Sequence, residues 1–231
     1  MRVAIVENMS PTHHGLVGVA LHEAGAVVEI FQPWRDGKLP GPDDHDALVS
    51  LGGAQNALDD AAHPYLPDLA RLMVAKAAMG HAVLGICLGA QVLARGLGAT
   101  NLIGQHREFG WVPVTLTPSA GQDPVLRHLP DVFPTFAWHS DHFTLPPGAR
   151  ALATTATAPV QCFMAHRAAY GMQFHFEASR AVVAHWSRDL VADIEGMQPG
   201  WARLHPSHAA SQGLAADSHG LAIARAWVAL I

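Results

Sequence analysis

Apolar and polar positions alternate in blocks through the first hundred residues. Short apolar, β-branched runs predict strands over 3–6, 26–32, 47–53 and 82–86. Apolar residues at helical spacing predict helices over 14–23, 65–79 and 88–97, and Gly25 and Gly80 mark two of the helix ends. The turn-rich stretch 34–46 predicts a surface loop. Strands alternating with helices indicate an α/β fold, whose mainly parallel sheet is covered by helices on both faces.

The second half of the chain follows a different pattern. Short strand candidates split by turn residues lie at 111–116, 132–138, 149–155, 160–164 and 169–174. They predict antiparallel additions to the parallel sheet. A helix is expected over 180–194, a loop over 196–213 and a last helix over 214–230. Without a repeat or an obvious linker, we expect one domain over 1–231, with a core of about 1–195 and a C-terminal loop and helix over about 196–231.

Composition narrows the class of protein. The 231 residues are half hydrophobic, and 14 Lys and Arg against 19 Asp and Glu give a formal charge of −5. Since no basic cluster occurs, we expect neither nucleic acid nor membrane as a partner. The N-terminus lacks a signal-peptide pattern, and two cysteines cannot form a disulfide framework, so a cytoplasmic protein is expected. The 16 histidines are scattered without ligand spacing, and we expect no metal or other cofactor.

Cys87 stands in a glycine frame between a predicted strand and a predicted helix. The pattern Gly85-x-Cys87-x-Gly89 is that of a nucleophile elbow, with cysteine in the place of serine. Flanking glycines let a sharp strand-to-helix turn close without Cβ clashes. The sulfur then lies at a helix N-terminus, where the helix dipole favours the thiolate. The alternative is a buried cysteine that only packs in a tight turn.

A base for this thiol is found at the end of the strand over 169–174. His175 and Glu177 are two residues apart, so in an extended chain their side chains point to the same side. Glu177 can then hold the imidazole of His175 in one tautomer and leave the other ring nitrogen for Cys87. An exposed His/Glu pair and a two-ligand metal arm are the alternatives. The carboxyl ends of strands are also where open α/β sheets place their sites.

These motifs resemble those of the class I glutamine amidotransferases, which use a Cys-His-Glu triad. The resemblance rests first on GICLGAQ at 85–91 and GMQFHFE at 171–177. Further matches follow in order along the chain: SLGGAQN at 50–56, LGAT at 97–100, EFGWVPV at 108–114, WHSDHFTLPPGA at 138–149 and PVQCF at 159–163. Together they cover roughly residues 45–195. The chain is most similar to stand-alone relatives of the GMP synthase amidotransferase domain, and a flavodoxin-like fold is implied.

The resemblance implies roles for individual residues. Cys87 would attack the side-chain amide carbon of glutamine, releasing ammonia and leaving a γ-glutamyl thioester that water hydrolyses. His175 would move the protons, and Glu177 would orient it. The backbone N–H groups of Gly53 and Leu88 would form the oxyanion hole. Substrate binding would fall to Gly52, Gln91, His139, Ser140 and Asp141. Cys162 is expected to be inert packing.

The resemblance also implies partners and leaves alternatives open. The small-molecule partner would be glutamine or another γ-glutamyl compound, and a separate synthetase or transferase subunit would accept the ammonia. A γ-glutamyl peptidase would use the same triad and release an amine instead. A catalytically silent regulatory module of the same fold is a further reading. Phe176 stands where the family commonly has proline. Without the fixed φ of proline, this turn is either looser or held by packing of the phenylalanine ring.

Overall fold

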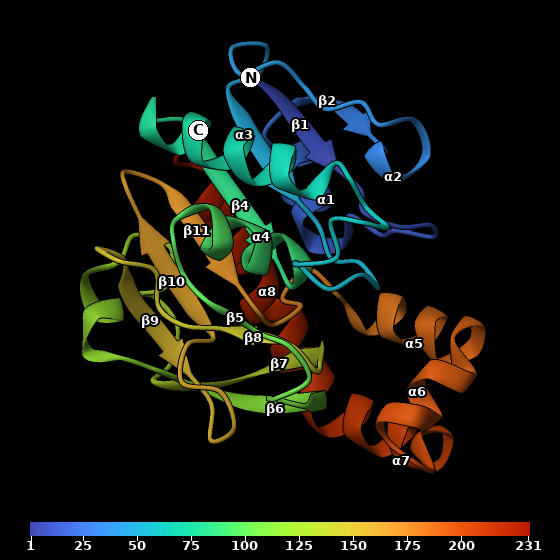
Figure 1. The fold of residues 1–231 in the computed structure, drawn as a ribbon. Coiled ribbons are helices and arrows are strands. Elements are labelled where there is room, and N and C mark those ends of the chain that lie inside the picture. Colours follow the sequence, from blue (N-terminus) through green and yellow to red (C-terminus); the bar gives the residue numbers. More distant parts are fainter.

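A computed structural model describes all residues 1–231 as a nine-stranded sheet, a two-stranded sheet and surrounding helices (Figure 1). The strands are β1 Arg2–Val6, β2 Val27–Phe31, β3 Ala47–Ser50, β4 Ala82–Ile86, β5 Asn101–Leu102, β6 Glu108–Leu116, β7 Val132–His139, β8 His142–Phe143, β9 Arg150–Thr154, β10 Cys162–Ala165 and β11 Ala169–Met172. The helices are α1 Gly15–Glu23, α2 Pro33–Asp36, α3 Leu66–Ala78, α4 Leu88–Gly96, α5 Arg180–Asp189, α6 Val191–Met197, α7 Trp201–His208 and α8 Leu214–Val228.

The large sheet has the order β2-β1-β3-β4-β11-β10-β9-β6-β7. Pairing is parallel from β2 to β11 and antiparallel from β11 to β7. Strands β5 and β8 form the small antiparallel sheet. The expectation of a mixed, mainly parallel sheet with antiparallel additions in the second half is therefore confirmed.

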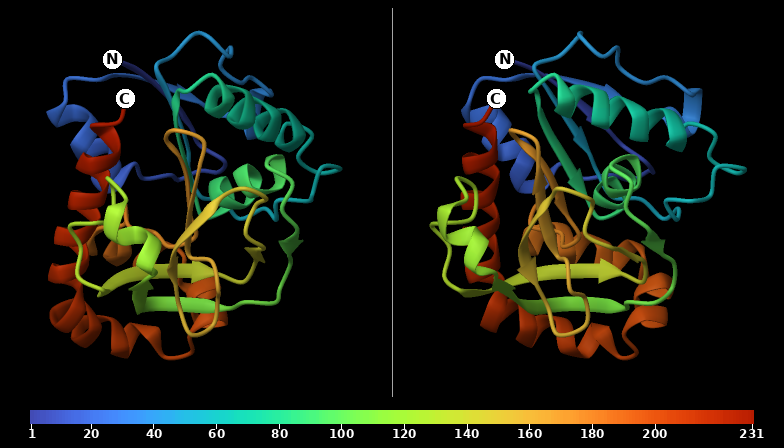
Figure 2. Two further views of the ribbon diagram at one scale, coloured as in Figure 1. Left: turned by 90° about the vertical axis from the view of Figure 1, so that its left-hand side faces the viewer. Right: turned by 60° about the vertical axis from the view of Figure 1, so that its left-hand side comes forward.

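Helices cover both faces of the parallel part. Figure 2 shows α1 and α8 on one side of the sheet and α3 and α4 on the other. Alternate side chains of each strand feed the two cores, since successive side chains point to opposite faces. Ile5 packs in one core with Ile223 and Trp227 of α8, whereas Ala4 packs in the other with Met73 of α3. The site is thus carried by a sheet buried on both faces.

The parallel pairing brings four strand ends to one edge of the sheet. Strands β1, β3, β4 and β11 are neighbours and run in the same direction. The segments that follow them, among them Gly52, Gly53, Cys87 and His175, therefore emerge side by side. This is the edge where open α/β sheets place their ligand sites.

The C-terminal region differs from the sequence prediction in two places. The predicted helix over 180–194 is two helices, α5 and α6, which meet at Leu190. The expectation of a loop over 196–213 is wrong, since α7 and a π-helical turn, Ala209–Gly213, occupy most of it. Trp201 is the physical reason: this side chain is buried in an aromatic cluster with Trp111 and Phe136, and that packing holds α7 in place.

In the first half of the chain, the loop predicted over 34–46 begins within the short helix α2.

Candidate active site

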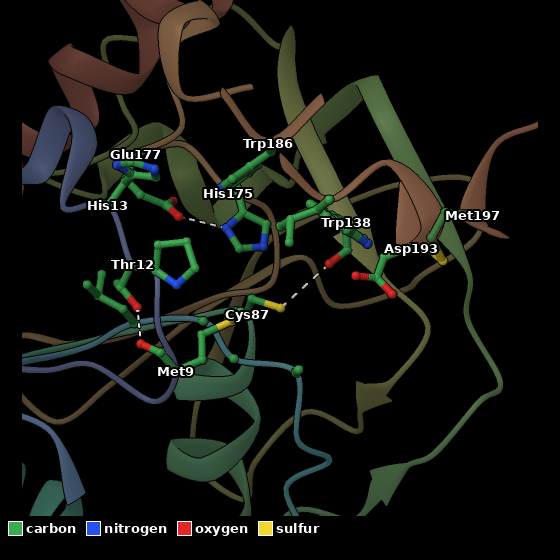
Figure 3. Close-up of a pocket in the computed structure, with 16 residues that line it drawn as sticks. Met9, Thr12, His13, Cys87, Trp138, His175, Glu177, Trp186, Asp193 and Met197 are labelled. Carbon is green, nitrogen blue, oxygen red and sulfur yellow. Dashed lines mark hydrogen bonds and ion pairs between the residues drawn. The ribbon is translucent and has the colours of Figure 1, made fainter. Parts of the chain in front are cut away.

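A cavity of about 390 Å³ lies at the carboxyl edge of the parallel strands (Figure 3). Cys87, His175 and Glu177 line it together, although β4 and β11 carry them from distant parts of the chain. Its other walls come from the loop after β1, the glycine pair after β3, Trp138 at the end of β7, and helices α5 and α6. The cavity has a size typical of small-molecule sites.

Cys87 has the strained backbone of a nucleophile elbow. Its φ of 52° and ψ of −109° lie outside the regions that non-glycine residues ordinarily adopt. The frame around it admits only glycine, because a Cβ on Gly89 would clash with the Ser50 carbonyl and one on Gly85 with the Gly89 carbonyl. Helix α4 begins at Leu88, so its dipole and its unpaired first-turn N–H groups stabilise negative charge on the sulfur.

His175 and Glu177 form a buried pair beside this elbow. Their Nδ1 and Oε1 atoms are 2.6 Å apart, and the two side chains are 9% and 5% exposed. The backbone N–H of His175 donates to the Phe136 carbonyl at 2.7 Å, which fixes the segment after β11 against β7. Trp186 of α5 stands edge-on to the imidazole, with ring centroids 5.4 Å apart. The ring of His175 is therefore held by a carboxylate on one nitrogen and shielded by an indole.

The charge on His175 follows from its neighbours. Burial by itself lowers the pKa of an imidazole, but the charge of Glu177, the nearby Cys87 and hydrogen bonds to both outweigh it. The pKa of His175 is therefore raised well above 6.5. The imidazolium form is favoured next to the thiol, as an ion-paired cysteine nucleophile requires.

Gly52 lies against the side chains of both Cys87 and His175. A Cβ at this position would lie 3.0 Å from Cε1 of His175 and 3.6 Å from Cβ of Cys87. A larger residue at this position would therefore crowd the imidazole of His175 and contact the Cys87 side chain. The sulfur of Cys87 lies 3.7 Å from the Trp138 carbonyl oxygen, which is its hydrogen-bond acceptor.

Phe176 packs its ring into the core, which resolves the question raised by the missing proline. The side chain is 2% exposed and lies edge-on to Phe174, with ring centroids 6.3 Å apart. Its backbone carbonyl abuts Gly220 of α8, where a Cβ would clash. The turn is thus fixed by tertiary packing, and the His175–Glu177 hydrogen bond is formed without proline.

Gly53 and Leu88, the predicted oxyanion donors, lie close to one another beside Cys87, since a Cβ on Gly53 would be 2.8 Å from Leu88 Cδ2. Gly53 lines the cavity, and its backbone N–H donates to no other group of the protein. Leu88 has a buried side chain and contributes the first N–H of α4. Two N–H groups are therefore available near Cys87 for an oxygen that becomes negative.

Four of the residues predicted to bind substrate do not line the cavity with their side chains. Gln91 is buried and donates to Gln173 Oε1 at 3.2 Å and to the Asp141 carbonyl at 3.3 Å. His139 lies 3.1 Å from Glu108 Oε2, and the Asp141 side chain accepts from Gly104 N–H at 2.8 Å. Ser140 contacts the Met197 sulfur at 3.6 Å. They form a polar network beside the cavity, and their role in substrate binding stays a prediction.

Several cavity residues carry no sequence signal that could have found them. The loop after β1 contributes Met9, Pro11, Thr12 and His13, and α5 and α6 contribute Trp186, Leu190, Asp193 and Met197. In the sequence, only positions 186, 190, 193 and 197 have the spacing of one helix face, although the structure breaks this stretch into two helices at Leu190. That spacing is ordinary for any amphipathic helix, so it does not mark a site.

Elsewhere the structure offers no second reactive centre of these kinds. Cys162 is fully buried in β10, and burial raises the pKa of its thiol. No group of three or more His, Cys, Asp or Glu residues is arranged to hold a metal ion. None of the helices is both long and apolar enough to cross a membrane.

Known proteins resemble this chain in sequence and in fold. Residues 39–185 match the family model of glutamine amidotransferase class I. The glutamine amidotransferase-like protein YfeJ of Salmonella typhimurium is 30% identical over 164 residues, which are 68% of each chain. A glutamine-hydrolysing GMP synthase of Chlorobaculum tepidum is 27% identical over 211 residues, 87% of this chain. The chain matches only 39% of that synthase's length.

Solved structures agree with these sequence matches in fold. A glutamine amidotransferase from Thermotoga maritima superposes with a TM-score of 0.85 at 24% identity, covering 98% of this chain and 97% of the other. One from Methylobacillus flagellatus gives a TM-score of 0.82 at 23% identity, covering 100% of this chain and 95% of the other. The resemblance seen in the sequence motifs is thus confirmed by the family match and by the fold. The chain belongs to the class I glutamine amidotransferase family.

Proposed function

We propose that the protein hydrolyses the side-chain amide of glutamine through Cys87, His175 and Glu177. The observation that carries this proposal is the strained Cys87 elbow facing the same cavity as the 2.6 Å His175–Glu177 pair. A thiol, a base and a group that orients the base are what acyl transfer by a cysteine nucleophile requires. We further propose that residues 1–231 act as one domain.

The proposed reaction has two halves. The thiolate of Cys87 attacks the amide carbon, and the N–H groups of Gly53 and Leu88 hold the oxyanion. The imidazolium of His175 then donates a proton to the departing nitrogen, so that ammonia leaves and a γ-glutamyl thioester remains. In the second half His175 takes a proton from water, whose oxygen attacks the thioester carbon to give glutamate and the free thiol.

The fate of the ammonia is part of the same proposal. Relatives of this chain include glutamine-hydrolysing GMP synthases, of which the chain spans a quarter to two fifths of the length. We propose that a separate synthetase or transferase polypeptide accepts the ammonia made here. Glutamine is accordingly the proposed small-molecule partner.

The test is ammonia and glutamate release from L-glutamine by the purified protein. Cys87→Ala removes the nucleophile and should abolish both products, whereas Cys162→Ala is the matched control and should retain activity. Equal turnover in Cys87→Ala would contradict the proposed mechanism. Release of amine from a γ-glutamyl dipeptide, without ammonia from glutamine, would keep the thiol mechanism and replace the substrate by that of a γ-glutamyl peptidase.

A further inference from the structure

One face of the α5–α6 region lines the cavity. Trp186, Leu190, Asp193 and Met197 follow one another at spacings of four, three and four residues, and all four border the space around Cys87. Trp186 comes from α5, Leu190 from the junction, and Asp193 and Met197 from α6, so two helices together present these side chains to the cavity. Trp186, Leu190 and Met197 are apolar, so Asp193 is the one charged side chain that this region contributes to the cavity.

Asp193 is the carboxylate of the cavity that has no partner in the protein. Glu177, the other acid in the wall, is bound to His175 at 2.6 Å. The nearby histidine of α5, His185, pairs with Asp189 and not with Asp193. Figure 3 shows Asp193 on the side of Cys87 where Trp138 lies, with its carboxylate directed toward the cavity.

The remaining charge of the cavity makes this carboxylate selective. No lysine or arginine lines the wall, and the histidine at its edge, His13, has a pKa lowered chiefly by burial and then by His185. The imidazolium of His175 is already compensated by Glu177. With Glu177 and the thiolate of Cys87 both beside the imidazolium of His175, the cavity keeps an excess of negative charge. Asp193 is the part of that charge without a partner in the protein, and a ligand that brings an ammonium group complements it.

We propose that Asp193 is the specificity-determining residue that binds the α-ammonium group of the substrate. The inference rests on the proposed hydrolysis of glutamine and deepens it, because glutamine carries that ammonium a few bonds away from the amide that Cys87 attacks. Asp193 is exposed at the cavity, so solvent partly screens this ion pair. Asp193 lies beyond residue 185, where the match to the family model ends.

A structural role for Asp193 makes a different prediction. The residue lies in the first turn of α6, where a negative charge also stabilises the helix dipole. Loss of that stabilisation would loosen α6 and lower turnover of every substrate alike. Loss of a contact to the ammonium group would instead lower turnover only of substrates that possess this group.

The experiment combines a change in the enzyme with a change in the substrate. L-Glutamine is compared with glutaramate, which keeps the amide and the carboxylate but lacks the α-ammonium group, by measuring kcat/KM for each. The enzymes are the full-length protein, Asp193→Asn and, as a matched control, Asp189→Asn on the outer face of α5. A charged hydrogen bond at a cavity mouth corresponds to about a tenfold effect.

The expected result is specific to one variant. The preference of the unaltered protein for glutamine over glutaramate should fall about tenfold in Asp193→Asn, through a higher KM for glutamine at similar kcat, and should persist in Asp189→Asn. An unchanged preference in Asp193→Asn, or equal losses on both substrates, overturns the assignment while glutamine hydrolysis stands. Absence of glutamine hydrolysis by the unaltered protein rejects the proposed function, and the assignment with it.

Discussion

Replacing Glu177 by glutamine is the sharpest perturbation of the proposed triad. Glutamine has nearly the same size, and its Oε1 atom can still accept from Nδ1 of His175. The change therefore removes the negative charge while it keeps the hydrogen bond and the tautomer. The change removes the charge interaction that keeps His175 protonated although burial lowers the pKa of its imidazole.

The structure sets the size of the effect. The pair is buried, and its 2.6 Å separation is that of a charge-assisted hydrogen bond. A hydrogen bond to a charged group contributes about 1.5–3 kcal/mol, against about 0.5–1.5 kcal/mol between neutral groups, so losing the charge costs about 1–2 kcal/mol. If this energy stabilises the protonated His175 in the transition state, kcat falls roughly fivefold to thirtyfold. Cys87→Ala, by contrast, should leave no turnover.

The charge on His175 gives this prediction a dependence on pH. In Glu177→Gln the charge of Glu177 no longer opposes burial, so the pKa of His175 should be lower than in the native protein. A raised pKa in the native protein stabilises the fold fully below 6.5, and this contribution is lost as the pH rises through the native pKa. The difference in unfolding free energy between the two proteins should therefore shrink toward alkaline pH.

Three measurements test the role of Glu177. The rate of ammonia release is recorded against pH for both proteins, and the His175 ring is followed by NMR over the same range. Denaturant unfolding at each pH gives the stability difference. A variant as active as the unaltered protein, with an imidazole that titrates at the same pH, would refute the role given to Glu177. A loss greater than that of Cys87→Ala would require Glu177 to take a direct chemical part.

Two further changes test the surroundings of the triad. Gly89→Ala places a methyl group against the Ser50 carbonyl, so we expect about 1–3 kcal/mol of destabilisation. Ammonia release should fall by more than the unfolded fraction explains, because the position of Cys87 is disturbed. A variant with unchanged melting temperature and turnover would show that the elbow tolerates a Cβ. Trp186→Ala removes the indole that stands edge-on to His175 and whose ring centroid lies 5.6 Å from that of Trp138. The kcat for ammonia release should therefore fall, and Trp186→Phe should restore much of it. Equal activity of the Ala and Phe variants would contradict a shielding role.

The sequence predicts the parallel half of the fold and the triad for the same physical reason. Buried parallel strands are apolar on both faces, so they appear as short continuous runs, and the residues that follow them meet at one edge. Cys87 and His175 follow two such runs, and β4 and β11 prove to be neighbours in the sheet. Neither the strand order nor the 2.6 Å bond of the pair is contained in the spacing of the residues.

The cavity walls could not be predicted because tertiary packing decides them. Pro199, Gly200 and Pro206 are typical of a loop, yet α7 spans Trp201–His208 with Pro206 inside it. A π-helical turn, Ala209–Gly213, follows directly after α7. The buried aromatic side chain of Trp201 outweighs these local preferences.

The central claim is that Cys87 is a nucleophile that recognises glutamine. The most direct measurement is the intact mass of the protein after incubation with 6-diazo-5-oxo-L-norleucine, an electrophilic glutamine analogue, alongside Cys87→Ala and Cys162→Ala. The account predicts one adduct on the unaltered protein and on Cys162→Ala, protection by L-glutamine, and none on Cys87→Ala. An adduct that persists in Cys87→Ala, or an unmodified protein that nevertheless hydrolyses glutamine, would contradict it.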